Sequence, residues 1–117
     1  MIEKKRGKQN FPSLCIFSMK IYKIKPNKHE SLIAWGKELS VNRKEEAIDA
    51  LKEENCTHEH MELFKIDNDW YVASYMEGEN LKPPNIEKEI DRKHKEILRD
   101  CIMEKIQTQV IYDLVQM

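Results

Sequence analysis

Two side chains in this sequence have the chemistry and the placement that proton transfer requires, His94 and Glu59. His94 lies in the apolar stripe of a predicted helix, between Ile90 and Ile97, so its imidazole is expected to face a sheet. Imidazole exchanges protons near neutral pH. Glu59 shares a predicted strand face with Met61, where removal from water favours the neutral carboxyl and suits it to acid–base work. We therefore expect Glu59 and His94 to form a catalytic pair. The alternative is that His94 is a structural, hydrogen-bonded residue at the core edge.

Three neighbouring residues on the same predicted strand could instead form a metal site. The two-residue period of a strand places His58, His60 and Glu62 on one face and Glu59 on the other. Imidazole and carboxylate ligands suit zinc, iron or copper. The spacing fixes no further ligand, so we predict no metal, with this set as an alternative. A polar strand end near solvent is the other interpretation.

Three aromatic residues are candidates for contact with a ligand. Tyr71 and Tyr75 share a strand face, where their hydroxyl groups could bind a polar molecule. Trp35 lies near Leu32 and Leu39 in a predicted helix, where its ring could stack on a ligand. Aromatic side chains in such positions also serve as packing elements, and this is the alternative for all three.

The spacing of apolar residues predicts the elements that position these side chains. Strands are expected over residues 14–24, 56–66, 70–77 and 107–115. One long helix or two shorter ones are expected between Leu32 and Leu51, and another helix over residues 86–102. The order βαββαβ predicts an α+β, ferredoxin-like domain with a four-stranded antiparallel sheet. We place this domain at residues 13–117, after a flexible N-terminal extension over residues 1–12.

The predicted strands have apolar residues on both faces. The third strand places Trp70, Val72 and Met76 on one face and Tyr71, Ala73 and Tyr75 on the other, and the last divides Val110, Tyr112 and Leu114 from Ile111 and Val115. Helices cover only one face of such a sheet. Because a broad apolar face in water marks an interface, we predict a homodimer in which two copies stack sheet to sheet.

Composition excludes several classes of function. The 20 Lys and Arg residues balance 21 Asp and Glu, so the charge predicts no nucleic-acid partner. No segment has the roughly 20 apolar residues that cross a membrane. Three cysteines without a CxxC pair favour a reducing, cytoplasmic location. Three glycines provide no dinucleotide fingerprint and no phosphate-binding loop, so no cofactor is expected.

Residues 19–115 resemble the dimeric α/β-barrel superfamily, and within it an uncharacterised bacterial family. The resemblance is carried by the stretches 19–26, 45–48 with Leu51, 56–59 and 90–94, which read MKIYKIKP, EEAI, CTHE and IDRKH. Known branches of the superfamily include antibiotic-biosynthesis monooxygenases, muconolactone isomerases and rhamnose mutarotases. The resemblance implies paired ferredoxin-like subunits and a small-molecule pocket between sheet and helices.

Two functions follow as expectations. The first is a homodimer that holds a small organic ligand and catalyses a cofactor-free isomerisation, mutarotation or monooxygenase-type step with Glu59 and His94. The second is a non-catalytic binding or assembly module in which the same residues satisfy buried hydrogen bonds.

Overall fold

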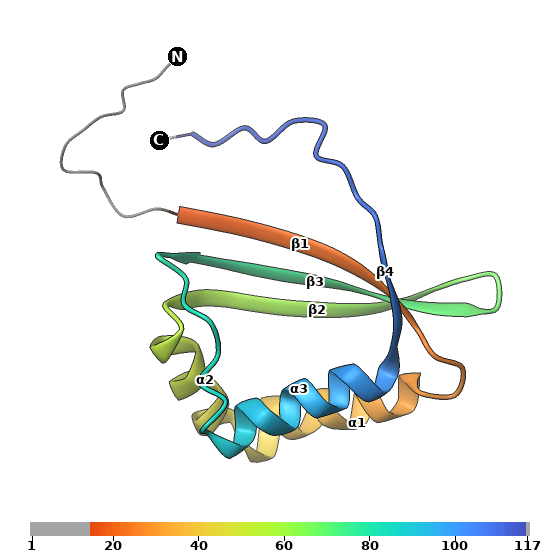
Figure 1. Cartoon of the computed structure of the whole chain (residues 1–117), viewed down its shortest axis with the longest axis horizontal. Coiled ribbons are helices and arrows are strands. Elements are labelled where there is room, and N and C mark those ends of the chain that lie inside the picture. Colours follow the sequence, from red (N-terminus) through yellow and green to blue (C-terminus); the bar gives the residue numbers. More distant parts are fainter. Residues whose placement is uncertain (1–14, 117) are drawn as a thin grey trace.

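The fold is a four-stranded sheet with all helices on one side (Figure 1). A computed structural model describes the backbone of residues 15–116 and the side chains of residues 17–116, so the expected extension over residues 1–12 lies outside the described residues. The elements are β1 (Cys15–Ile24), α1 (His29–Lys37), a π-helical segment (Glu38–Asn42), α2 (Lys44–Glu53), β2 (Cys56–Ile66), β3 (Asp69–Glu79), α3 (Glu89–Cys101) and β4 (Ile102–Ile106). The strand order β2-β3-β1-β4, antiparallel throughout, confirms the predicted α+β, ferredoxin-like arrangement.

The first crossover contains two helices rather than one. The π-helical segment separates α1 from α2, and within it Ser40 Oγ donates a hydrogen bond of 2.8 Å to the carbonyl of Gly36. Both α1 and α2 have acidic residues in the first turn and a lysine in the last, as the helix dipole favours.

Asparagine and aspartate residues make the tight turns between elements. Asn27, Asn55, Asp67 and Asn80 have positive φ angles of 67°, 61°, 55° and 55°. These residues tolerate the left-handed region better than other non-glycine residues. Asp67 forms the turn between β2 and β3, as the predicted hairpin requires.

The predicted last strand is wrong. β4 follows α3 directly, and residues 107–116 belong to no strand. The apolar pattern over 107–115 is typical of a buried strand. Its large apolar residues are nevertheless 69–85% exposed, namely Val110, Ile111, Tyr112, Leu114 and Val115. Because the segment is not part of the sheet, the predicted division of these residues between two sheet faces is wrong as well. The fourth strand is instead formed by the short segment whose Ile106 pairs with Ile21.

The core lies between the sheet and the helices, in two clusters. Ile24, Leu32, Val72 and Cys101 form one, and Trp35, Ala50 and Ile90 form the other. The opposite face of the sheet, here called the open face, has no helix over it (Figure 1). It presents a set of aromatic and aliphatic side chains, namely Phe17, Met19, Ile21, Phe64, Tyr71 and Tyr75.

The division of β3 between the two faces is as predicted. Trp70 and Val72 pack in the core, while Tyr71 stacks on Phe64 and Tyr75 contacts Phe17 on the open face. Phe17 remains 54% exposed. Within the described part of the chain, no helix has the length and apolar character to span a membrane.

Candidate functional site

Hydrogen bonds join the end of α2 to the residues that follow β3, and the buried residue Glu54 lies at this contact. The backbone carbonyl of Glu54 accepts a hydrogen bond of 2.9 Å from the amide of Lys82. Asn55 Nδ2 donates one of 2.8 Å to the carbonyl of Asn80. Gly78 allows the close approach, because a Cβ atom there would lie 2.2 Å from the Asn55 carbonyl oxygen. As a result the Glu54 residue is only 7% exposed.

Glu54 is a buried acid among other acids. Burial is the first cause that raises the pKa of its carboxyl to about 7, and the negative charges of Asp91 and Glu59 are the next two. Lys88 opposes the shift. No hydrogen bond is among the causes that set the pKa of this carboxyl. A carboxyl in this position holds and releases a proton near neutral pH.

Asp91, in the first turn of α3, has one buried carboxylate oxygen. Its Oδ2 is enclosed and has no hydrogen-bond partner among the described residues. Asp91 as a whole is half-buried. We call Glu54, Glu59 and Asp91 the acidic cluster; its members come from the end of α2, from β2 and from α3. The sequence does not distinguish Glu54 and Asp91 from their neighbours, because each lies in a run of charged residues that is typical of a solvated surface.

The indole of Trp35 fixes the orientation of His94. Trp35 Nε1–H donates a hydrogen bond of 2.8 Å to His94 Nδ1, joining α1 to α3. Because Nδ1 accepts this bond, a neutral His94 must have its proton on Nε2. Lys93 Nζ and the Arg43 guanidinium lie 5.5 Å and 5.9 Å from the centre of the Trp35 ring. The Nε2–H group of a neutral His94 can therefore donate a hydrogen bond to a ligand.

Glu59 and His94 are not in direct contact. Both belong to the helix side of the sheet, since Glu59 lies on the same strand face as Leu63, which packs against the core. Glu59 is nevertheless exposed near the end of β2, so the predicted removal of its carboxyl from water is wrong. No hydrogen bond or ion pair joins the two side chains within the described residues. Their pairing as catalytic groups remains a prediction, whereas the electrostatic coupling of Glu59 to Glu54 is present in the structure.

The histidines of β2 lie on the open face, as the strand period predicts. His58 contacts the Tyr75 ring at 5.1 Å between centroids, and His60 Nε2 is 3.6 Å from Glu62 Oε1. No group of three or more His, Cys, Asp or Glu side chains within residues 17–116 is placed to hold a metal ion. The alternative metal site on His58, His60 and Glu62 thus has no support in the geometry.

The predicted ligand-binding aromatics are divided between the two sides of the sheet. Tyr75 donates a hydrogen bond to the Glu77 carboxylate, and Tyr71 lies 5.6 Å from the Phe64 ring, both on the open face. The structure therefore does not bring these tyrosines together with Glu59 and His94. Trp35 alone of the three lies among the helices, and it is only 5% exposed.

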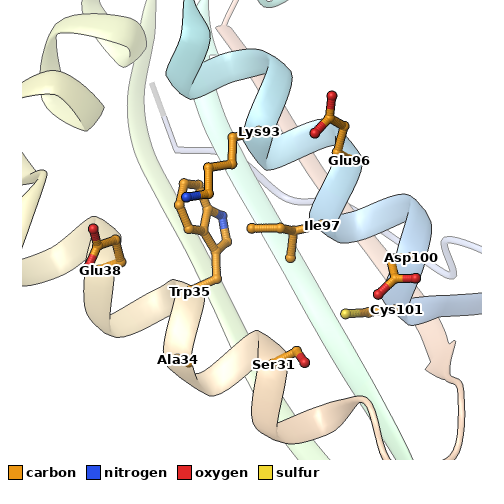
Figure 2. A pocket seen from close by; sticks show the side chains of 9 residues that line it. All are labelled: Ser31, Ala34, Trp35, Glu38, Lys93, Glu96, Ile97, Asp100 and Cys101. Carbon is orange, nitrogen blue, oxygen red and sulfur yellow. The ribbon is translucent and has the colours of Figure 1, made fainter.

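A shallow groove runs between α1 and α3 on the side away from the sheet (Figure 2). Its volume is about 470 Å³. Figure 2 shows Lys93 across the Trp35 ring, with the strands behind the two helices. The lining residues are Ser31, Ala34, Trp35, Glu38, Lys93, Glu96, Ile97, Asp100 and Cys101. This groove lies outside the acidic cluster and contributes none of its carboxylates.

Fold and site together define a small α+β protein with a ferredoxin-like sheet and a buried glutamate, Glu54, at the end of α2. The chain belongs to a family of unknown function, DUF6176, whose family model matches residues 17–117. No curated protein and no solved structure matches the chain. The relation to the dimeric α/β-barrel superfamily therefore stays a prediction.

Proposed function

We propose that this protein binds a small organic molecule beside the acidic cluster and moves a proton on it without a cofactor. The observation that carries this proposal is the buried residue Glu54, which is electrostatically coupled to Asp91 and Glu59, together with the enclosed Oδ2 of Asp91, which has no hydrogen-bond partner among the described residues. A hydroxyl group of a ligand would supply the hydrogen-bond donor that Asp91 Oδ2 lacks.

The acidic cluster suits both halves of a proton transfer. With a pKa near 7, the Glu54 carboxyl donates a proton when neutral and accepts one when ionised. Its neighbours Asp91 and Glu59 keep the negative charge costly and so favour return of the proton. This chemistry fits an isomerisation or mutarotation better than an oxygenation, because proton movement alone completes those reactions.

His94 would act as a hydrogen-bond donor in this scheme. Trp35 occupies its Nδ1, and the remaining Nε2–H can hold a ligand oxygen. In this scheme Glu59 and His94 have different roles and do not form an acid–base pair. The carboxylates exchange the proton, with Glu54 foremost and Glu59 beside it, and His94 orients the molecule on which they act.

We also propose that two copies associate through their open faces. Phe17 and Met19 are 54% and 51% exposed on this face of the single chain. Tyr71 and Tyr75 lie beside them on β3. Exposed apolar side chains that adjoin one another on a flat sheet favour burial against a second surface of the same kind.

One observation favours the second function, a binding or assembly module without turnover. The hydrogen bond from Trp35 gives His94 Nδ1 a partner within the fold, as a structural role would require. In that case the ligand, or a second copy, would be held without any change in its bonds.

Ligand-induced stabilisation of the purified chain tests the proposal. A ligand that binds the native state raises the melting temperature, so small sugars, phenolics and hydroxy acids are screened against the wild type and Glu54→Gln. We expect at least one class to stabilise the wild type and to lose its effect in Glu54→Gln. The matched control is Glu53→Gln, which changes the preceding, exposed carboxylate.

Turnover is then examined with the stabilising ligand by NMR exchange of its protons in D2O. Exchange that disappears in Glu54→Gln but persists in Glu53→Gln supports an enzyme. Binding without exchange supports the binding module. If no compound stabilises the wild type, or if Glu54→Gln responds as the wild type does, the acidic cluster is not a ligand site.

A further inference from the structure

An apolar segment follows the last strand and is left without a packing partner in the described chain. Residues 107–116 form no helix or strand, and Figure 1 shows them leaving the sheet after β4. We call them the C-terminal segment. Its large apolar side chains are 69–85% exposed: Val110, Ile111, Tyr112, Leu114 and Val115. The family model matches residues 17–117 and therefore includes this segment.

Part of the β1 edge has no neighbouring strand among the described residues. β4 pairs only with residues 21–24 of β1, whereas β1 begins at Cys15. Within the described residues, no strand therefore lies beside residues 15–20 on the β4 side. An extended strand edge is a template for another strand.

The side-chain pattern of the C-terminal segment fits this edge. In an extended conformation Val110, Tyr112 and Leu114 point to one side, while Ile111 and Val115 share the other side with Asp113. The wholly apolar side matches the open face, where Phe17 and Met19 end the β1 row. A strand added at residues 15–20 would extend that apolar face by one row.

We propose that the C-terminal segment of each chain adds as a strand to residues 15–20 of β1 in a second copy of this chain. One chain contains both the segment and the receiving edge, so a two-fold pair satisfies both at once. In its own chain the segment departs from β1 at the point where continued pairing would begin, next to Ile106. This inference rests on the homodimer proposed above and names the element that completes it.

Cross-linking between distinguishable copies tests the assignment. Tyr112 is replaced by p-benzoylphenylalanine in an unlabelled full-length chain, which is mixed with a ¹⁵N-labelled wild-type chain and irradiated. We expect cross-links from the unlabelled segment to labelled residues 15–20. The control places the same cross-linker at Val41, which is 65% exposed on the helical side. Links confined to one chain, or links to another part of the labelled chain, overturn the proposal.

Sedimentation of charged variants supplies the second measurement. Val110→Asp with Leu114→Asp changes only exposed positions, as does the matched pair Val41→Asp with Ile86→Asp. We expect the first pair to raise the dimer dissociation constant at least about tenfold and the control pair to leave it unchanged. Equal dissociation constants for both pairs, without cross-links to β1, overturn the segment's role and leave the open-face homodimer standing. A wild type that stays monomeric overturns both and leaves the acidic cluster untouched.

Discussion

Gly78 and Asn55 are packed so closely that a Cβ atom at residue 78 would lie 2.2 Å from the Asn55 carbonyl oxygen. The same atom would lie 2.7 Å from Leu81 Cδ2 and 3.0 Å from the Cys56 Cα. The residue before Asn55 is the buried Glu54, so the absence of a side chain at residue 78 lets the chain that carries Glu54 approach β3.

Gly78→Ala is expected to destabilise the protein by about 1–3 kcal/mol, because backbone atoms rather than a flexible side-chain tip would have to move. Urea denaturation measures the loss. The matched control is Gly36→Ala in α1, where no atom lies within 4 Å of the added Cβ. That change should stabilise by roughly 0.5–1 kcal/mol through helix propensity. Equal effects at the two glycines would contradict the close contact.

Glu54 should make stability fall as pH rises. Its folded pKa of about 7 lies above the ordinary value of 4.5, so the native state retains a proton that the unfolded chain has released. The contribution is present in full below pH 4.5 and is lost as pH rises through 7. Discounted for partial screening, the loss is roughly 1–3 kcal/mol. Unfolding of the wild type and Glu54→Gln at pH 5 and pH 8 measures it.

Glu53→Gln is the matched control for this titration. The pKa of Glu53 is lowered, first by a hydrogen bond from Asn85 and then by one from Lys88, so its effect has the opposite sign. Its stabilising contribution is present above pH 4.5 and is lost as pH falls. If Glu54→Gln shows the same pH dependence of unfolding as the wild type, the Glu54 carboxyl does not hold its proton near neutral pH.

Trp35→Phe should remove the donor that fixes His94. A half-buried Nδ1 then lacks its partner, and we expect a loss of about 1–3 kcal/mol in the free energy of unfolding. Nitrogen NMR of the imidazole provides a more specific measurement, because the wild type should show the Nε2–H tautomer and the variant a mixture. An Nδ1–H tautomer in the wild type would be incompatible with the hydrogen bond from Trp35.

The two described buried thiols should respond differently to replacement by a hydroxyl. Cys101 is fully buried in the core cluster, where a serine hydroxyl would have to give up its hydrogen bonds to water. Cys101→Ser is therefore expected to cost about 1–3 kcal/mol. In Cys56→Ser the hydroxyl can keep the hydrogen bond that Sγ donates to the His58 carbonyl at 3.4 Å, so the loss should be smaller. Thermal unfolding of both variants makes the comparison. A larger loss for Cys56→Ser would show that the acceptor is not used.

The two strands of the hairpin, β2 and β3, are predictable from sequence because each has a clear local pattern of residue types. Cys56–Ile66 has the predicted bounds, and the alternation of Trp70 and Val72 with Tyr71 reports correctly which side of β3 faces the core. The helix predicted over residues 86–102 begins later, at Glu89, because Ile86 lies in a turn where the Glu87 amide donates to Asn85 Oδ1. Local spacing therefore recovered the element order and the sidedness of the sheet.

The candidate site and the last strand could not be predicted from the spacing of residues, because both depend on contacts between distant parts of the chain. Trp35 and His94 are far apart in sequence, and only the packing of α1 on α3 joins them. Glu54 is buried because Gly78, on another element, makes room for its neighbour Asn55. The apolar residues after Ile106 have the periodicity of a buried strand but no partner in their own chain, so periodicity alone assigned them to the wrong place.

The left-handed turns have a consequence for the entropy of folding. In the described chain every positive φ angle falls on asparagine or aspartate and none on glycine. Glycine has the most backbone freedom to lose when a chain folds, so turns built without it leave the unfolded ensemble less favoured. The described part of the chain buries only a few apolar side chains, so its hydrophobic stabilisation is modest. A smaller loss of conformational entropy on folding therefore matters more for its stability.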